Sequence, residues 1–157
     1  MIVLAIDPGN IESAYVLMDD HYKITDFGKI ENNNLLDMIP RMQFDSVAIE
    51  MVASYGMAVG ASVFDTCVWV GRFTEAVKPC KAQYIYRKDV KMNICGQTKA
   101  KDSNIRQALI DRFAKHDFKN GKGTKQEQDW FYGFKADIWQ AYAVGVTYID
   151  SELEKCV

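Results

Sequence analysis

Two short apolar segments of this chain each end in a carboxylate, and this repeated pattern limits the folds that the sequence can adopt. Met1–Asp7 reads MIVLAID and Phe44–Glu50 reads FDSVAIE. A nearly continuous apolar run of this length is typical of a strand that is buried on both faces, as strands in parallel sheets usually are. Because a helical segment is expected between them, the two strands should pair in parallel through a crossover.

The other elements follow from periodicity and from turn residues. After the Pro8-Gly9-Asn10 turn, the apolar and alternating patterns predict two more strands, so the chain opens as an antiparallel three-stranded meander. Helices are predicted where apolar residues recur at helical spacing, with Asn32–Asn34 capping the first and Asp102 or Ser103 capping the third. The expected strands are 14–18, 22–30 and 82–86, and the expected helices are 32–39, 58–77, 105–113 and 137–149. The pattern indicates an α/β fold with a mixed sheet.

Length and composition predict one ordinary globular domain. The 157 residues, 48 % of them hydrophobic, suit a single domain over residues 1–157. No window approaches the roughly 18 apolar residues of a membrane span, and no signal-peptide pattern opens the chain, so a soluble, cytoplasmic protein without a membrane partner is expected. The four cysteines form no C-x-x-C pair, so neither a zinc site nor a disulfide framework is indicated.

Charge is unevenly distributed along the chain. Residues 78–125 hold 13 Lys or Arg against 4 Asp or Glu, a local charge of +9 that leaves −11 for the remainder. A basic block beside an acidic remainder suits a phosphate-contacting surface near an acidic metal site, although chance clustering on a solvated surface is the alternative. The side chains expected to contact phosphate flank two loops of this block: Lys99, Lys101, Arg106, Lys122 and Lys125.

Three carboxylates are expected to meet at one edge of the sheet. Parallel pairing would bring Asp7 and Glu50 together, and two adjacent carboxylates repel unless a proton or a cation separates them. A hard divalent ion is the natural occupant of such a site. Asp137 begins an apolar helix that would carry it to the same edge, although an Asp at this position is also a common helix cap, and an Asp before Pro-Gly a common turn residue.

Several segments resemble RuvC-type Holliday junction resolvases, in particular the RuvC-like resolvases carried by bacteriophages. AIDPGN at Ala5–Asn10 looks like the signature that opens this family, and VAIE at Val47–Glu50 looks like its second acidic strand. Similar segments follow in the family's order at residues 54–60, 66–73, 99–113 and 132–145. The resemblance implies an RNase H-like fold with a mixed five-stranded sheet flanked by helices. It also implies a homodimer that nicks paired strands of branched DNA with Mg2+ or Mn2+ and needs no small-molecule cofactor.

The resemblance also assigns roles to individual residues. Asp7, Glu50 and Asp137 stand where the family keeps its catalytic, metal-binding acids, with Asp7 expected to bridge two ions and the product to carry a 5'-phosphate. Gln140 stands where cellular RuvC proteins keep a further Asp, and it is expected either to orient a ligand or a water or to leave the second metal site weaker or differently shaped. Tyr55 lies in the loop after Glu50, where it would either stack on an unpaired base or pack against the protein.

Other functions share these features. The same carboxylates would serve an RNase H-like nuclease that cuts RNA–DNA hybrids or DNA ends. An actin-like ATPase or sugar kinase also has an Asp before a Gly-containing turn, but it needs two such domains and therefore a longer chain. A structure-specific DNA-binding protein with weak or no catalysis is the third alternative, because Gln140 departs from the acidic pattern. Four-way junctions, and by extension three-way junctions and forks, are the expected substrates, with the helix near 58–77 as the expected dimer contact.

Overall fold

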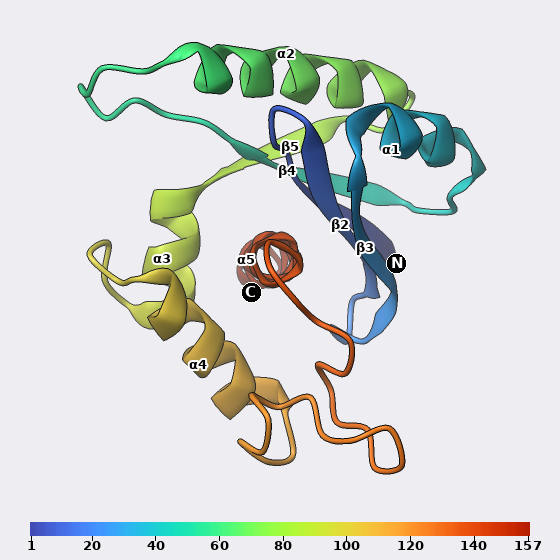
Figure 1. Cartoon of the computed structure of the whole chain (residues 1–157), viewed down its shortest axis with the longest axis vertical. Coiled ribbons are helices and arrows are strands. Elements are labelled where there is room, and N and C mark those ends of the chain that lie inside the picture. The colour runs from blue at the N-terminus through green and yellow to red at the C-terminus, as the bar shows by residue number, and fades with distance from the viewer.

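A five-stranded mixed sheet forms the centre of the molecule. The computed structural model describes all 157 residues, and the strand order is β3-β2-β1-β4-β5 (Figure 1). The strands are β1 (Ile2–Asp7), β2 (Glu12–Asp19), β3 (Ile24–Glu31), β4 (Ser46–Met51) and β5 (Ala82–Tyr86). The helices are α1 (Asn32–Met38), the 3-10 turn η1 (Ile39–Arg41), α2 (Ala61–Ala76), α3 (Arg87–Cys95), α4 (Asp102–Phe113) and α5 (Ile138–Lys155). The predicted α/β fold with a mixed five-stranded sheet is confirmed.

The register of the sheet aligns the ends of its parallel strands. β1 pairs antiparallel with β2 and parallel with β4, with Ile6 opposite Ile49. Asp7 and Glu50 are the next residues along these two strands, so both reach the same edge. β5 continues the parallel part beside β4, with Glu50 opposite Ile85. The first residue after β5 therefore arrives at this edge as well.

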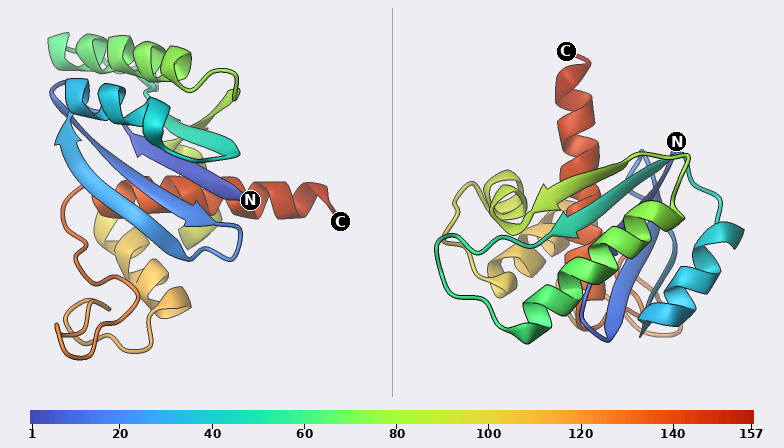
Figure 2. Two further views of the ribbon diagram at one scale, coloured as in Figure 1. Left: turned by 90° about the vertical axis from the view of Figure 1, so that its right-hand side faces the viewer. Right: turned by 90° about the horizontal axis from the view of Figure 1, so that it is seen from above.

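Helices cover both faces of the sheet, which explains why β1 is apolar on both sides. Figure 1 shows α1 and α2 on one face and α5, with α3 and α4, on the other, and Figure 2 shows the same layers from the side. Val3 and Ala5 of β1 pack toward α5, whereas Leu4 and Ile6 belong to the core beneath α1 and α2. Since neither face meets water, the strand has no polar alternate positions.

α5 lies very close to the sheet. A Cβ atom built on Gly145 would lie 2.4 Å from Sδ of Met18 and 3.1 Å from Cβ of Ala5. Only glycine therefore allows the backbone of α5 to approach the strands this closely. None of the helices combines the length and the apolar character that a membrane span requires.

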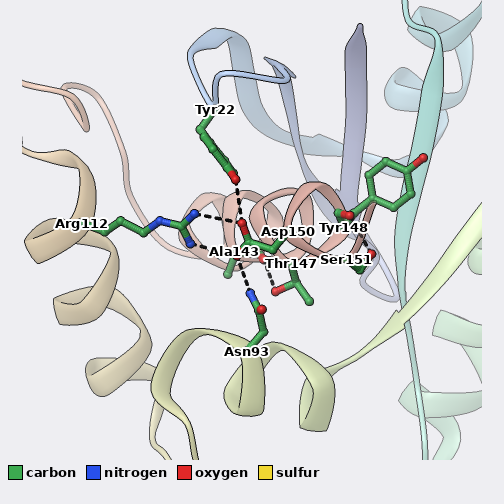
Figure 3. Close-up of polar contacts among 8 residues, drawn as sticks. All are labelled: Tyr22, Asn93, Arg112, Ala143, Thr147, Tyr148, Asp150 and Ser151. Atoms are coloured by element: carbon green, nitrogen blue, oxygen red, sulfur yellow. Dashed lines mark hydrogen bonds and ion pairs between the residues drawn. The ribbon is translucent and has the colours of Figure 1, made fainter. Parts of the chain in front are cut away.

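A polar cluster around Asp150 ties α5 to its neighbours (Figure 3). The carboxylate of Asp150 accepts two hydrogen bonds of 2.9 Å from Arg112, one of 2.7 Å from Tyr22 Oη and one of 2.8 Å from Asn93 Nδ2. Although partial burial opposes ionisation, these hydrogen bonds lower the pKa of Asp150. One side chain thus joins α5 to α4, α3 and the turn between β2 and β3.

The structure differs from the sequence-based expectations at three helices: one was not expected, and two begin with other capping residues. α3 was not predicted, although Gly96 ends it in the left-handed conformation (φ 72°) that is common just after a helix. The cap of α4 is Lys101 and not Asp102 or Ser103, and the side chain of Asn104 accepts the Lys101 N–H. Asn32 was expected to cap α1. It is instead buried inside the first turn, where its side chain donates to the carbonyl of Gly9.

Candidate active site

Asp7 lies where β1 turns away from the sheet. The amide of Gly9 donates a hydrogen bond of 3.0 Å to Oγ of Ser13, which closes the turn. A Cβ on Gly9 would lie 2.2 Å from the carbonyl oxygen of Glu12, so the turn requires glycine. The Asp-Pro-Gly motif therefore has a structural reason that is separate from the chemistry of Asp7.

Asp7, which is half-buried, and Glu50, which is buried, form a carboxylate pair. Burial raises the pKa of Asp7 well above its ordinary value, and the neighbouring Glu50 and Asp137 raise it further, whereas Arg87 opposes the shift. Glu50 is only 8 % exposed, and its Oε2 is a buried oxygen without a hydrogen-bond partner. Buried polar atoms almost always have partners in folded proteins, so this oxygen requires either a proton shared with the neighbouring carboxyl of Asp7 or a bound cation.

The other oxygen of Glu50 is held by two donors. Nε of Arg87 donates to Oε1 at 3.1 Å, and Nε2 of Gln140 donates to the same atom at 3.3 Å. Arg87 also reaches Asp102, with Nη1 2.8 Å from its Oδ1. Gln140, which the sequence placed near the acids as an orienting residue, thus contacts one of them directly from the first turns of α5.

Asp137 lies beside this pair but is turned toward another partner. It occupies the position before α5, and its side chain makes no capping hydrogen bond. Its Oδ2 forms an ion pair of 2.8 Å with Nζ of Lys29, and the side chain is 57 % exposed. The structure therefore does not support the interpretation of Asp137 as an ordinary helix cap.

The acids do not converge on one point. No three acidic, histidine or cysteine side chains are arranged so that they could hold one metal ion together. The residues nevertheless fit a hard divalent cation, because Asp7 and Glu50 are adjacent carboxylates and Glu50 offers an unpartnered buried oxygen. Such an ion would favour the ionised form of Asp7, which burial disfavours.

Three cavities meet at Arg87. The first, of about 260 Å³, is lined by Asp7, Glu50, Tyr55 and Arg87 among others. The second, of about 370 Å³, has a basic lining and shares Tyr55 and Arg87 with the first; its other lining residues are Lys88, Lys91 and Thr98. The third, of about 180 Å³, is lined on its polar side by Arg87, Asp102, Arg106, Asp137 and Gln140. The acidic site is therefore continuous with a basic surface.

The residues predicted to bind DNA are spread around this region. Tyr55 is 60 % exposed and lines both the acidic and the basic cavity, so it does not pack inside the protein. Arg106 lies on α4 with its guanidinium carbon 5.7 Å from the ring centre of Trp139. Lys99 and Lys101 are exposed at the start of α4, whereas Lys122 and Lys125 lie in the loop before α5 and line none of the three cavities.

Sequence reasoning missed two cations of the site, Lys29 and Arg87. The available signal for Arg87 was its place directly after the third parallel strand, where side chains reach the same edge as Glu50. Lys29 carried no comparable signal, because it lies on an edge strand outside the basic block. Only the folded chain brings it to Asp137.

Comparison with known proteins gives the fold. No family model matches the sequence, and no curated protein matches it. Among solved structures, RuvC of Thermus thermophilus is similar with a TM-score of 0.66 at 14 % identity, over 98 % of this chain and 97 % of that one. The same protein in complex with a Holliday junction substrate is similar with a TM-score of 0.70 at 14 % identity, over 98 % of this chain and 96 % of that one. The chain therefore has the RNase H-like fold of RuvC over its whole length.

Proposed function

We propose that the chain is a divalent-metal-dependent endonuclease that nicks branched DNA, with four-way junctions as its main substrate. The observation that carries the proposal is the adjacent pair of half-buried Asp7 and buried Glu50, with one oxygen of Glu50 unpartnered, at the edge of the sheet. The RuvC-like fold supports it, since a structural neighbour was solved with a Holliday junction. Two carboxylates buried side by side destabilise the metal-free protein, which favours a functional over a structural reason for the pair.

Asp7, Glu50 and Asp137 would hold Mg2+ or Mn2+. When bound, such ions supply an activated water and stabilise the negative charge on the leaving oxygen. Gln140 would fix the orientation of Glu50 by donating to its Oε1. Hydrolysis of this kind is expected to leave a 5'-phosphate.

Basic side chains beside the acids would hold the DNA backbone. Arg106 lines the same cavity as Asp137 and Gln140, and Lys99 and Lys101 are exposed at the start of the same helix. Lys122 and Lys125 would contact phosphates further from the cut. Tyr55 is exposed between the acidic and basic cavities, where its ring would stack on a base that the junction leaves unpaired.

A homodimer would match the near two-fold symmetry of a four-way junction. α2 presents an apolar face to solvent that includes Phe64, Cys67, Val68 and Gly71, with Phe64 61 % and Val68 60 % exposed. These positions follow the i, i+3, i+4, i+7 spacing of one helix face. A second copy that packs against this face would cover it and provide the second active site that paired nicks require.

A cleavage panel tests the proposed function. Purified protein is incubated with a labelled four-way junction, a linear duplex of the same sequence and an RNA–DNA hybrid, each with Mg2+, Mn2+ or EDTA. Paired nicks in the junction that depend on the metal and are absent from the duplex are expected. Cleavage of the hybrid, or of duplex ends, would assign the chain to another RNase H-like nuclease. Junction binding without cleavage would favour a DNA-binding protein with weak or no catalysis.

A further inference from the structure

Two cations of the chain each hold one of the outer acids of the site. Arg87 bonds Glu50 at 3.1 Å and Asp102 at 2.8 Å, and Lys29 bonds Asp137 at 2.8 Å. The cations come from different parts of the fold, since Arg87 begins α3 and Lys29 lies on β3. Asp7 forms no such ion pair, so Glu50 and Asp137, named the outer acids, are the two that a cation holds.

These ion pairs account for the failure of the three acids to converge. Asp137 is directed to Lys29, and the Oε1 of Glu50 is occupied by Arg87 and Gln140, so only Oε2 remains free. A divalent cation that needs oxygen atoms from both outer acids must compete with these side chains. The energy of the competing contacts lowers the apparent affinity for the metal.

We infer that Lys29 and Arg87 act as an ion-pair clamp that holds the site in a metal-free arrangement and releases Glu50 and Asp137 when a divalent cation binds. The inference rests on the proposed function and adds two positioning residues to it. The clamp also explains why three acids near one another do not unfold the metal-free protein, because a cation of the chain itself neutralises each outer carboxylate.

Release of Arg87 would link metal binding to DNA binding. Arg87 lines the basic cavity together with Lys88 and Lys91, neither of which forms an ion pair. A guanidinium that leaves Glu50 would remain next to this cavity, where a backbone phosphate is its best partner. By thermodynamic linkage, the metal would then strengthen DNA binding, and DNA would strengthen metal binding by the same factor.

Mn2+ affinity of the DNA-free protein tests the clamp. Electron paramagnetic resonance of free Mn2+ is used to titrate the full-length wild type, Arg87→Met and Lys29→Met, with circular dichroism to verify that each variant is folded. Lys88→Met is the matched control, since it removes an unpaired charge from the residue next to Arg87. The clamp predicts that Arg87→Met and Lys29→Met each bind Mn2+ about tenfold more tightly than wild type. The affinity of Lys88→Met for Mn2+ should change by less than about twofold.

The outcomes separate the inference from the proposed function. Unchanged or weaker Mn2+ binding in both clamp variants, beside normal binding by wild type, would overturn the clamp and leave the proposed function standing. An equal gain in Lys88→Met would also overturn it, because general electrostatics would then suffice. No Mn2+ binding by wild type would overturn the metal site of the proposed function, and the clamp with it.

The link to DNA needs a second measurement. Fluorescence anisotropy gives the affinity for a labelled four-way junction in Ca2+ and in EDTA. Wild type and Lys81→Met, which removes an exposed lysine outside the three cavities, should show the same gain in affinity from Ca2+, and Arg87→Met a smaller one. A gain in Arg87→Met equal to that of wild type would overturn the link between metal and DNA binding.

Discussion

Asp7 is buried next to a second carboxylate, and this position costs stability at neutral pH. Burial first, and then Glu50 and Asp137, raise the pKa of Asp7 in the folded protein. A group whose pKa is raised by folding adds stability below its unfolded pKa of about 3.9, and this stability is lost as the pH rises through the folded value. At pH 7 Asp7 therefore destabilises the metal-free protein.

Replacing Asp7 by Asn should make the metal-free protein more stable. Asparagine has the shape of the protonated acid and no charge, so the gain is expected to be on the order of 1 kcal/mol, or about 2–4 °C in Tm. Thermal unfolding in EDTA at pH 7 measures it, with the exposed Asp37→Asn as the control that should not change. A variant less stable than wild type would contradict the electrostatic description of the site.

Asp150 should behave in the opposite way. Its pKa is lowered, since the hydrogen bonds from Arg112, Asn93 and Tyr22 outweigh its partial burial. Asp150→Asn is expected to destabilise the protein by about 2 kcal/mol at pH 7, because it removes charge-assisted hydrogen bonds. The effect is not larger because solvent partly screens Arg112. The contribution is present above about pH 3.9 and is lost as the pH falls through the lowered pKa. Urea unfolding of both proteins between pH 7 and pH 3 should show their difference shrinking only at the acid end.

At the scale of elements, the contact between α5 and the sheet depends on Gly145. A valine there would bring side-chain atoms into Met18 and Ala5, and neither can move far in a packed core. Gly145→Val should cost about 1–3 kcal/mol although it removes a helical glycine. The midpoint of urea unfolding measures this. A variant as stable as wild type would mean that α5 does not lie as close to the strands as the structure shows.

Elements with strong local patterns could be predicted, and contacts between distant segments could not. The apolar runs before Asp7 and Glu50 gave both strands and their shared edge, because burial on two faces leaves a clear signal in the sequence. α3 is a short helix of 9 residues with a polar sequence, so it was missed together with Arg87 at its start. The ion pair of Lys29 with Asp137 depends on the packing of an edge strand beside the last helix, which no local pattern records.

At the scale of the whole molecule, the exposed apolar face of α2 predicts that two copies of the chain form a dimer through this helix. Val68→Asp would place a charge in the middle of the proposed dimer contact, where desolvation is unfavourable. The variant is expected to be a folded monomer, with wild type a dimer, as measured by light scattering coupled to size-exclusion chromatography. An unchanged dimer would place the contact elsewhere, and a monomeric wild type would remove the dimer from the proposal.

The uneven distribution of charge predicts how DNA binding responds to salt. The basic residues beside the acidic site would displace counterions from DNA, so the affinity for a four-way junction should fall steeply between about 50 and 200 mM salt. Fluorescence anisotropy at several salt concentrations gives the slope, and Lys101→Ala should reduce it by about one unit. A flat response would contradict the assignment of the basic block as the DNA surface.

The most direct test of the central claim compares wild type, Asp7→Asn and Asp37→Asn on one labelled four-way junction. Cleavage is measured with Mg2+ and binding with EDTA, so that the affinity reports DNA contacts without any contribution from the metal. If the carboxylates catalyse metal-dependent cleavage while other residues hold the DNA, Asp7→Asn will lose cleavage and keep its affinity for the junction. Asp37→Asn will match wild type in cleavage and in affinity. Full cleavage by Asp7→Asn, or loss of binding together with cleavage, would contradict this division of roles.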